Sequence, residues 1–287
     1  MNYNKKISCV IRTLNEAKFI GRLIQSLRAQ KNIDADLEII VVDSGSTDST
    51  VEIVKKCGVK LIEIPKEQFN YSYSLNLGIK QTKSDFIVIL SAHAIPSQND
   101  WLQKMISHFE NSKVAGVYCR QIPWPDADLH ETLRIERMFG ENPRSFSKKT
   151  PNADMHFSNA ASCIRRSVWE KHPFVIMPAA EDHEWAHFVI ENGYIIIYEP
   201  EAAVYHSHNE SCRKVAQRMI QLEKSADIRL SRKRNLVLTI KQSIGWFIRS
   251  IKQILSPTYG NGRRVRLASQ CIARSFWYIV DFKRKTK

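Results

Sequence analysis

Short apolar runs alternate with amphipathic segments along the first 120 residues of the chain. Leu37–Val42 and Phe86–Leu90 are continuous apolar runs bounded by polar residues, a pattern typical of buried strands. Residues 16–30 carry their apolar side chains at helical spacing, and Asn15 is placed to cap such a helix. Strands that alternate with helices predict βαβ units, a parallel sheet and therefore an α/β fold.

The same kind of pattern continues to about residue 208. Strands are expected at residues 7–11, 37–42, 59–64, 86–90, 115–119, 194–198 and 202–205. Helices are expected at residues 16–30, 49–57, 72–81, 101–109, 167–171 and 181–192. Prolines interrupt the pattern between residues 121 and 154, where we expect a long excursion, helical around residues 129–139, that covers a binding cleft.

The positive charge of the chain is concentrated at its C-terminal end. The net charge is +14 overall, but residues 211–287 hold 19 lysines and arginines against three acidic residues. Apolar residues recur at helical spacing in this segment, at Val237, Ile240, Ile244, Phe247, Ile251, Ile254, Leu267, Cys271, Phe276 and Ile279. Cationic amphipathic helices either bind an anionic membrane surface or pack on the main domain with a solvated basic face, and both interpretations stay open. No nucleic-acid partner is expected.

These patterns divide the chain into a domain at residues 1–215 and a basic helical C-terminal extension at residues 216–287. No run reaches the roughly 18 apolar residues of a membrane-spanning helix, and we see no signal peptide. The six cysteines form no CxxC pair, so neither a zinc site nor a disulfide framework is indicated. We therefore expect a cytoplasmic protein that can bind peripherally at the inner face of the cell membrane.

Polar clusters follow several of the predicted strands. Asp43 ends an apolar run and opens a loop of small hydroxyl residues, in which Thr47 or Asp48 is placed to cap the next helix. The other clusters are residues 13–16, residues 91–96, and residues 181–182 with 206–208. Because ligands bind at the carboxyl edge of open α/β sheets, these clusters predict one cleft, where Asp43 can accept a hydrogen bond from a nucleobase imide or from ribose hydroxyls.

The clusters together resemble the family 2 glycosyltransferases, which have the GT-A fold. The resemblance covers about residues 5–212 and rests on the order and spacing of several motifs: TLNE, VVDSGSTDST, SAHAIP, Asn159-Ala160-Ala161 with Arg165-Arg166, EDHEW and HSHNE. It implies a Rossmann-like mixed sheet flanked by helices. SLNLG, SAHAIP and HSHNE are most similar to a subgroup associated with bacterial surface polysaccharides.

The resemblance implies an inverting enzyme that moves a sugar from a UDP or dTDP sugar to a hydroxyl of a polysaccharide or lipid-linked glycan. Asp182 would be the general base that takes the proton of the acceptor hydroxyl, with Glu181 binding the acceptor or orienting Asp182. Asp43 would accept the N3 proton of the pyrimidine base. The nucleotide-sugar site would comprise Thr13, Asn15, Glu16, Asp43, Ser44, Asn76, Ser91 and Ala92.

One motif departs from the family pattern. Most of these enzymes end the strand before SAHAIP with Asp-x-Asp, whose second carboxylate binds a divalent cation, whereas here Ser91 and His93 stand at those positions. Manganese accepts an imidazole nitrogen more readily than magnesium does. We therefore predict that His93 binds a Mn²⁺-type cation together with His206 or His208. In the alternative, the enzyme is metal-independent and His93 contacts the diphosphate itself.

Two other functions remain as alternatives. A non-catalytic nucleotide-sugar-binding or assembly protein would account for the missing metal carboxylates. A sugar-nucleotide nucleotidyltransferase has a similar sheet but normally a Gly-rich loop after the first strand, and residues 11–18 contain no glycine. A Rossmann dehydrogenase is disfavoured because GxGxxG is absent there.

Overall fold

The computed structural model describes residues 6–32, 37–150, 155–208 and 210–229, together with residues 244, 245, 248 and 272. The chain forms two compact units. The first unit comprises residues up to 126 with residues 134–177 and 181–207, and the second comprises residues 127–133, residues 178–180 and the chain from residue 208 onward. The predicted domain boundary at residue 215 stays a prediction.

The first unit is built on one mixed sheet with the strand order β3-β2-β1-β4-β8-β6-β9-β5, and β7 pairs with β9. Its strands are β1 (Ile7–Thr13), β2 (Leu37–Asp43), β3 (Lys60–Glu63), β4 (Phe86–Ser91), β5 (Ile95–Pro96), β6 (Val114–Ile122), β7 (Arg144–Phe146), β8 (Ala161–Arg165) and β9 (Ile195–Tyr205). β1 to β4 pair in parallel, as predicted, whereas β8 runs antiparallel between β4 and β6. The α/β class with a mixed sheet is confirmed.

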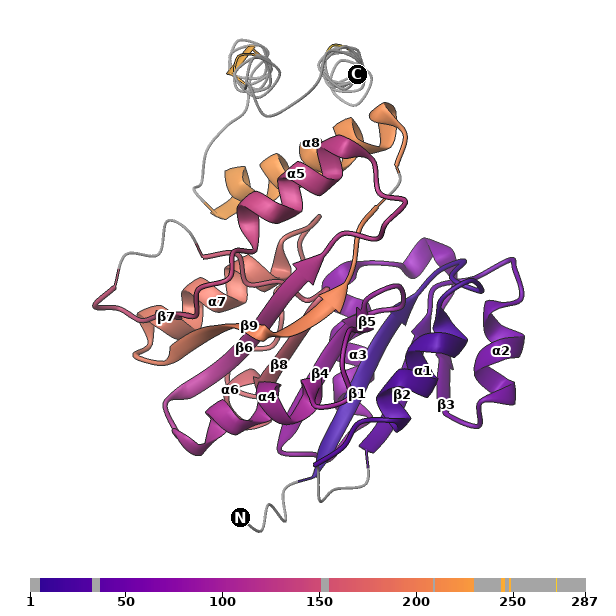
Figure 1. Cartoon of the computed structure of the whole chain (residues 1–287), viewed down its shortest axis with the longest axis horizontal. Coiled ribbons are helices and arrows are strands. Elements are labelled where there is room, and N and C mark those ends of the chain that lie inside the picture. The colour runs from indigo at the N-terminus through magenta and orange to yellow at the C-terminus, as the bar shows by residue number, and fades with distance from the viewer. Residues whose placement is uncertain are drawn as a thin grey trace. The chain divides into compact units, whose positions relative to one another are not determined.

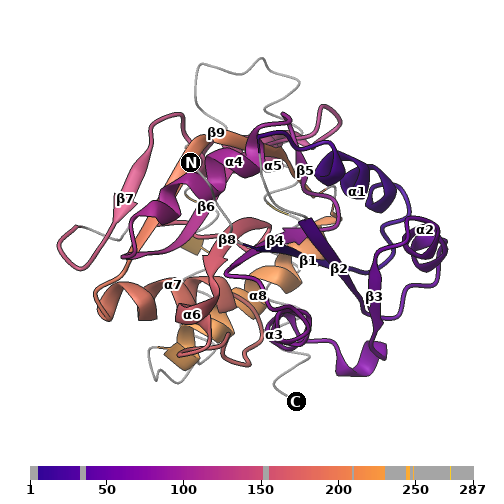
Figure 2. The same ribbon diagram turned by 90° about the horizontal axis from the view of Figure 1, so that it is seen from below.

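Helices cover both faces of this sheet (Figures 1 and 2). They are α1 (Ile20–Arg28), α2 (Thr50–Lys56), α3 (Tyr71–Lys80), α4 (Trp101–Ser107), α5 (Leu129–Met138), α6 (Arg166–Trp169) and α7 (Glu181–Glu191), with short 3₁₀ turns at Lys66–Gln68 and His108–Glu110. Figure 2 shows α1 and α4 on one face and α3, α6 and α7 on the other.

Alternation along the strands explains why the sheet can carry two helical layers. Cys9 and Ile11 of β1 belong to the hydrophobic cluster that includes α1 and α4, whereas Val10 belongs to the cluster that includes α3 and α7. Both faces of β1 are therefore buried, which explains its continuous apolar run. Helix α3 approaches this strand closely, since a Cβ at Gly78 would lie 2.5 Å from Val10 Cγ1.

The predicted elements are largely confirmed, with three corrections. Asn15 does not cap α1, which begins at Ile20; its φ is 56° and its side chain binds the next loop instead. β5, β7 and β8 were not predicted, because they are short and carry no clear alternation. The two strands predicted at residues 194–205 form one strand, β9, despite Pro200. The helix expected around residues 129–139 is α5, whose first turn belongs to the second unit.

Helix α8 (Cys212–Arg229) is the longest described element of the second unit. Within this unit Ala179 N donates to Ser225 Oγ at 3.0 Å, and Arg218 pairs with Glu210 at 3.1 Å. None of the helices in the described part of the chain is both long and apolar enough to cross a membrane. The predicted amphipathic helices beyond residue 229 lie almost entirely outside the described residues.

Candidate active site

Asp43 is the last residue of β2, and its carboxylate accepts hydrogen bonds from the loop that follows it. Its Oδ1 accepts the N–H groups of Gly45 and Ser46 at 3.0 and 2.8 Å, and its Oδ2 accepts Ser46 Oγ at 2.5 Å. Gly45 has φ 84°, which a residue with a Cβ adopts only with strain. The carboxylate is 1% exposed. These bonds use three of its roughly four acceptor positions, so one lone pair is available to a base or ribose.

Hydrogen bonds join the loop after β1 to the loop that follows Asp43. Asn15 N donates to Ser46 Oγ, Thr47 N donates to Asn15 Oδ1, and Glu16 N donates to Thr50 Oγ1, each at 2.8 Å. Asn15 therefore holds the two loops together rather than capping a helix. The prediction that Thr47 or Asp48 caps α2 is wrong: Ser49 is the N-cap residue and makes no side-chain cap hydrogen bond. The N–H of Thr50, the first residue of α2, instead donates at 3.0 Å to the Asp48 carboxylate. The Thr50 hydroxyl also donates to it and lowers the pKa of Asp48.

Two buried hydroxyls at this sheet edge have no hydrogen-bond partner among the described residues: Thr13 Oγ1 and Ser44 Oγ. The two residues are neighbours, since Ser44 N donates to Thr13 O at 3.0 Å. Leaving a buried hydroxyl unpaired costs about 1–3 kcal/mol, so such atoms point to a ligand that completes their bonding. This observation favours Thr13 and Ser44 as binding residues.

The side chain of Asn76 makes its hydrogen bonds to Trp169 and Phe174. Its amide donates to Phe174 O at 2.7 Å, and its oxygen accepts Trp169 Nε1 at 3.0 Å and Phe174 N at 3.2 Å. These contacts tie α3 to the segment after α6 and use three of the four hydrogen bonds that an Asn side chain can make. The structure therefore gives Asn76 a structural role, and its predicted contact with the nucleotide sugar stays untested.

The SAHAIP segment brings His93 against other predicted site residues. Ser91 N donates to Ala160 O, and Ala92, fully buried, donates its N–H to Arg12 O. His93 Nδ1 lies 2.7 Å from Glu16 Oε1, and its ring stacks on His206 with centroids 4.7 Å apart and an interplanar angle of 10°. His206 follows β9 directly, and His208, two residues further on, opens the second unit.

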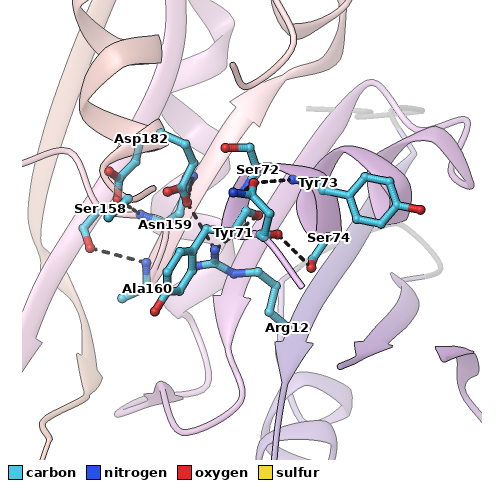
Figure 3. A network of polar contacts seen from close by, with 12 residues as sticks. Arg12, Tyr71, Ser72, Tyr73, Ser74, Ser158, Asn159, Ala160 and Asp182 are labelled. Atoms are coloured by element: carbon cyan, nitrogen blue, oxygen red, sulfur yellow. Dashed lines mark hydrogen bonds and ion pairs between the residues drawn. The ribbon is translucent and has the colours of Figure 1, made fainter. Parts of the chain in front are cut away.

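Arg12 links the end of β1 to the start of α7 (Figure 3). Its Nη1 lies 3.2 Å from Glu181 Oε1 and 3.4 Å from Tyr71 O. Asn159, which is fully buried, joins the two adjacent carboxylates: its N–H donates to Asp182 Oδ2 at 3.0 Å, and its side-chain amide donates to Glu181 Oε1 at 3.4 Å.

Burial is the main influence on the pKa values of Glu181 and Asp182. It raises the pKa of Glu181 and the pKa of Asp182, whereas the Arg12 cation and the Asn159 hydrogen bonds act in the opposite direction. A carboxyl group whose pKa is raised toward neutrality accepts a proton more readily than an ordinary one. The arrangement therefore suits proton abstraction.

Several polar residues of this region were not predicted. Arg12 and Gln121 were missed, although Arg12 directly precedes the TLNE motif, and Asn159 was noted without a role. Conversely, Arg165 and Arg166 donate to backbone carbonyls, among them Val114 O at 3.0 Å and Ser84 O at 2.6 Å. Those two arginines hold strand ends and turns together.

The mixed sheet, its helical layers and the polar carboxyl edge define the GT-A type of α/β fold. The chain belongs to glycosyl transferase family 2, whose family model matches residues 8–172. The predicted enzyme class, a glycosyltransferase, is thereby confirmed.

Two relatives are similar over most of the chain. The O-antigen chain rhamnosyltransferase RfbN of Salmonella typhimurium is 30% identical over 228 residues, 74% of this chain and 70% of that protein. The O-antigen chain rhamnosyltransferase WbaN of Salmonella anatum is 32% identical over 203 residues, 66% of this chain and 62% of that protein. They agree with the predicted subgroup of bacterial surface-polysaccharide enzymes.

Among solved structures, the fold is similar to that of the mannosyltransferase PcManGT from Pyrobaculum calidifontis, determined in complex with GDP-Man and Mn²⁺. The TM-score is 0.66 at 17% identity, with 98% of this chain and 88% of that chain covered.

Proposed function

We propose that this protein is an inverting glycosyltransferase that moves a sugar from a nucleoside diphosphate sugar, of the UDP or dTDP type, to a hydroxyl of a polysaccharide or lipid-linked glycan. The observation that carries this proposal is the pairing of Arg12 with Glu181, 3.2 Å apart. Arg12 precedes Thr13, which is in register with Asp43, and Glu181 precedes Asp182. The pair therefore joins the nucleotide side of the site to a carboxylate able to act as base.

In this mechanism Asp182 removes the proton of the acceptor hydroxyl while its oxygen attacks the anomeric carbon opposite the departing diphosphate. The base is held by the N–H of Asn159 and lies in the first turn of α7. Glu181 balances the charge of Arg12 and keeps the neighbouring carboxylate in place. Thr13 and Ser44 offer hydroxyls to the nucleotide, and Asp43 offers its remaining lone pair to the base.

The residues near His93 fit a divalent cation of the Mn²⁺ type. The ligand nitrogens of His93 and His206 lie within 4.8 Å of each other, and imidazole suits manganese better than magnesium. A cation held there would supply positive charge to the diphosphate leaving group. The structure of PcManGT with Mn²⁺ supports a cation in this fold. The role of His208, like the membrane-surface contact and the cytoplasmic location, stays a prediction.

The relatives narrow the substrates to be tested. Two are O-antigen rhamnosyltransferases, which supports a deoxyhexosyl donor and a bacterial polysaccharide acceptor. Membership of a glycosyltransferase family argues against the nucleotidyltransferase alternative. The non-catalytic binding protein differs from our proposal only in lacking turnover.

A panel of UDP, dTDP, GDP and CMP sugars, with and without Mn²⁺, tests the proposal. A ligand that binds only the native state raises the melting temperature, so we expect a shift with UDP or dTDP sugars. The same sugars are then incubated with a polyprenyl-linked glycan, and we expect transfer. Binding without transfer or hydrolysis would favour the non-catalytic protein, and a shift only with GDP or CMP sugars would overturn the pyrimidine diphosphate assignment.

A further inference from the structure

In each of the stacked imidazoles of His93 and His206, Nδ1 contacts a side-chain oxygen atom of another residue. Glu16 Oε1 lies 2.7 Å from Nδ1 of His93, and Gln121 Oε1 lies 2.8 Å from Nδ1 of His206. His206 is 5% exposed and Gln121 is 4% exposed. All four residues belong to the first unit.

These contacts fix which nitrogen of each ring carries the proton. A carboxylate oxygen and an amide oxygen can only accept, so Nδ1 is the donor in both rings. The other end of the Gln121 amide is bonded too, since its Nε2 donates to Ser158 Oγ at 3.1 Å. In each neutral ring the lone pair is therefore on Nε2.

We propose that Glu16 and Gln121 are positioning residues that hold His93 and His206 as Nδ1–H tautomers and direct their Nε2 lone pairs toward one shared divalent cation. This inference rests on the cation of the proposed function. Metal-binding histidines commonly donate their second N–H to a carboxylate or carbonyl oxygen, which fixes the ring and makes it a better ligand. Glu16, predicted to contact the nucleoside, is thereby assigned to the metal site.

Surrounding side chains restrict the movement of the rings further. The Phe19 ring lies 6.3 Å from that of His93 and 5.5 Å from that of Trp124. Trp124 in turn stacks on Tyr205, the residue before His206. These aromatic contacts limit rotation of the imidazoles.

Gln121 also connects the two imidazoles to the candidate base. Ser158 Oγ accepts hydrogen bonds from Gln121 Nε2 and from Ala160 N. Asn159, the residue between Ser158 and Ala160, donates its N–H to Asp182. The segment 158–160 therefore orients the acceptor behind His206 and the carboxylate of Asp182 together. Glu16 has no such link, so substitutions of Glu16 test the inference without disturbing the base.

The test measures binding of Mn²⁺ alone, through the EPR signal of the free ion, in wild type and single variants. Glu16→Leu and Gln121→Leu each remove an acceptor, and we expect Mn²⁺ affinity to fall 10- to 100-fold. Glu16→Gln keeps an acceptor oxygen, and its loss should be smaller. Glu199→Leu is the matched control, because Glu199 accepts from His108 at the same 2.7 Å outside this site, and its affinity should equal wild type.

Nitrogen-15 NMR of histidine-labelled wild type provides a second measurement that needs no variant. We expect both His93 and His206 to show the Nδ1–H tautomer at pH 8. Glu16→Leu and Gln121→Leu variants that bind Mn²⁺ like wild type, or Nε2–H tautomers in wild type, would overturn the inference. A wild type that transfers sugar but binds no Mn²⁺ would overturn both the cation and the inference, and leave the transferase proposal standing.

Discussion

Arg12 and Glu181 are 169 positions apart in the chain, and their side chains meet at 3.2 Å with only 15% and 4% of their surfaces exposed. Arg12 is the last residue but one of β1, and Glu181 is the first residue of α7. The ion pair therefore links β1, which lies beside the Asp43 loop, to α7, which carries Asp182. The charge of Arg12 also compensates the buried Glu181 and its half-buried neighbour Asp182.

Arg12→Met should be strongly destabilising, because it leaves Glu181 buried without its cation. Removing one partner of a buried ion pair costs about 3–5 kcal/mol, which a urea denaturation curve measures. Arg12→Met combined with Glu181→Gln should cost less than the two single changes added together. The control is Lys55→Met, which breaks the exposed pair with Glu63 and should cost less than about 1 kcal/mol. Equal losses in Arg12→Met and Lys55→Met would contradict this account of the pair.

Asp43→Asn should weaken nucleotide binding. The amide cannot accept bonds on both of its terminal atoms, so it cannot hold the loop and also receive a base N–H. Loss of a hydrogen bond to a charged group costs about 1.5–3 kcal/mol, which is 10-fold or more in the Kd for UDP or dTDP, measured by calorimetry. Asp48→Asn is the control, because Asp48 serves the start of α2. An unchanged Kd in Asp43→Asn would argue against the predicted base contact.

Gly78→Ala should destabilise the first unit through a steric clash. The new Cβ would lie 2.5 Å from Val10 Cγ1 and 3.0 Å from Val42 Cγ2, so α3 must move away from the sheet. Overpacking of this kind costs typically about 1–3 kcal/mol. Gly140→Ala meets nothing within 4 Å and serves as the control. Thermal unfolding compares the two, and similar melting temperatures would show that α3 packs less tightly than described.

The pH dependence of transfer should reflect the buried acids. Burial raises the pKa of Asp182, and a base works only when ionised, so activity should be full at high pH and lost as pH falls through the raised pKa. The acidic limb of kcat/KM should therefore lie above the ordinary aspartate value of about 3.9. Because Glu181 and Asp182 interact, the limb reports the pair. A profile that stays flat down to pH 4 would exclude a base with a raised pKa.

Local patterns were sufficient to predict most of the fold. The apolar runs of β1, β2 and β4 and the stripe of α1 determine their own elements, because burial on one or both faces is visible in the spacing of side chains. β8 was missed because its five residues, Ala161–Arg165, are too few to show a period. Its antiparallel insertion depends on pairing with β4 and β6, which are distant in sequence.

The site could be predicted only in part. Asp43, His93 and Asp182 stand at element ends, where a polar residue is conspicuous in the sequence. Arg12 and Gln121 lie inside strands, and their roles depend on partners 169 and 85 positions away. Contacts at that separation leave no trace in local patterns. Asn15 shows the opposite limit, since a residue suited to cap a helix instead bonds a neighbouring loop.

Transfer by Asp182→Asn tests the central claim most directly. The variant keeps an oxygen for the Asn159 N–H and cannot take up a proton, but its NH2 group then faces the His183 N–H that Asp182 Oδ1 accepts at 2.8 Å. Nucleotide binding should therefore be preserved, while the melting temperature should fall. For the folded variant we predict an unchanged nucleotide Kd with a roughly 10²- to 10⁴-fold lower kcat, and a wild-type product of inverted anomeric configuration by NMR. Transfer by Asp182→Asn at near wild-type kcat, or a product that retains the donor's configuration, would contradict the account.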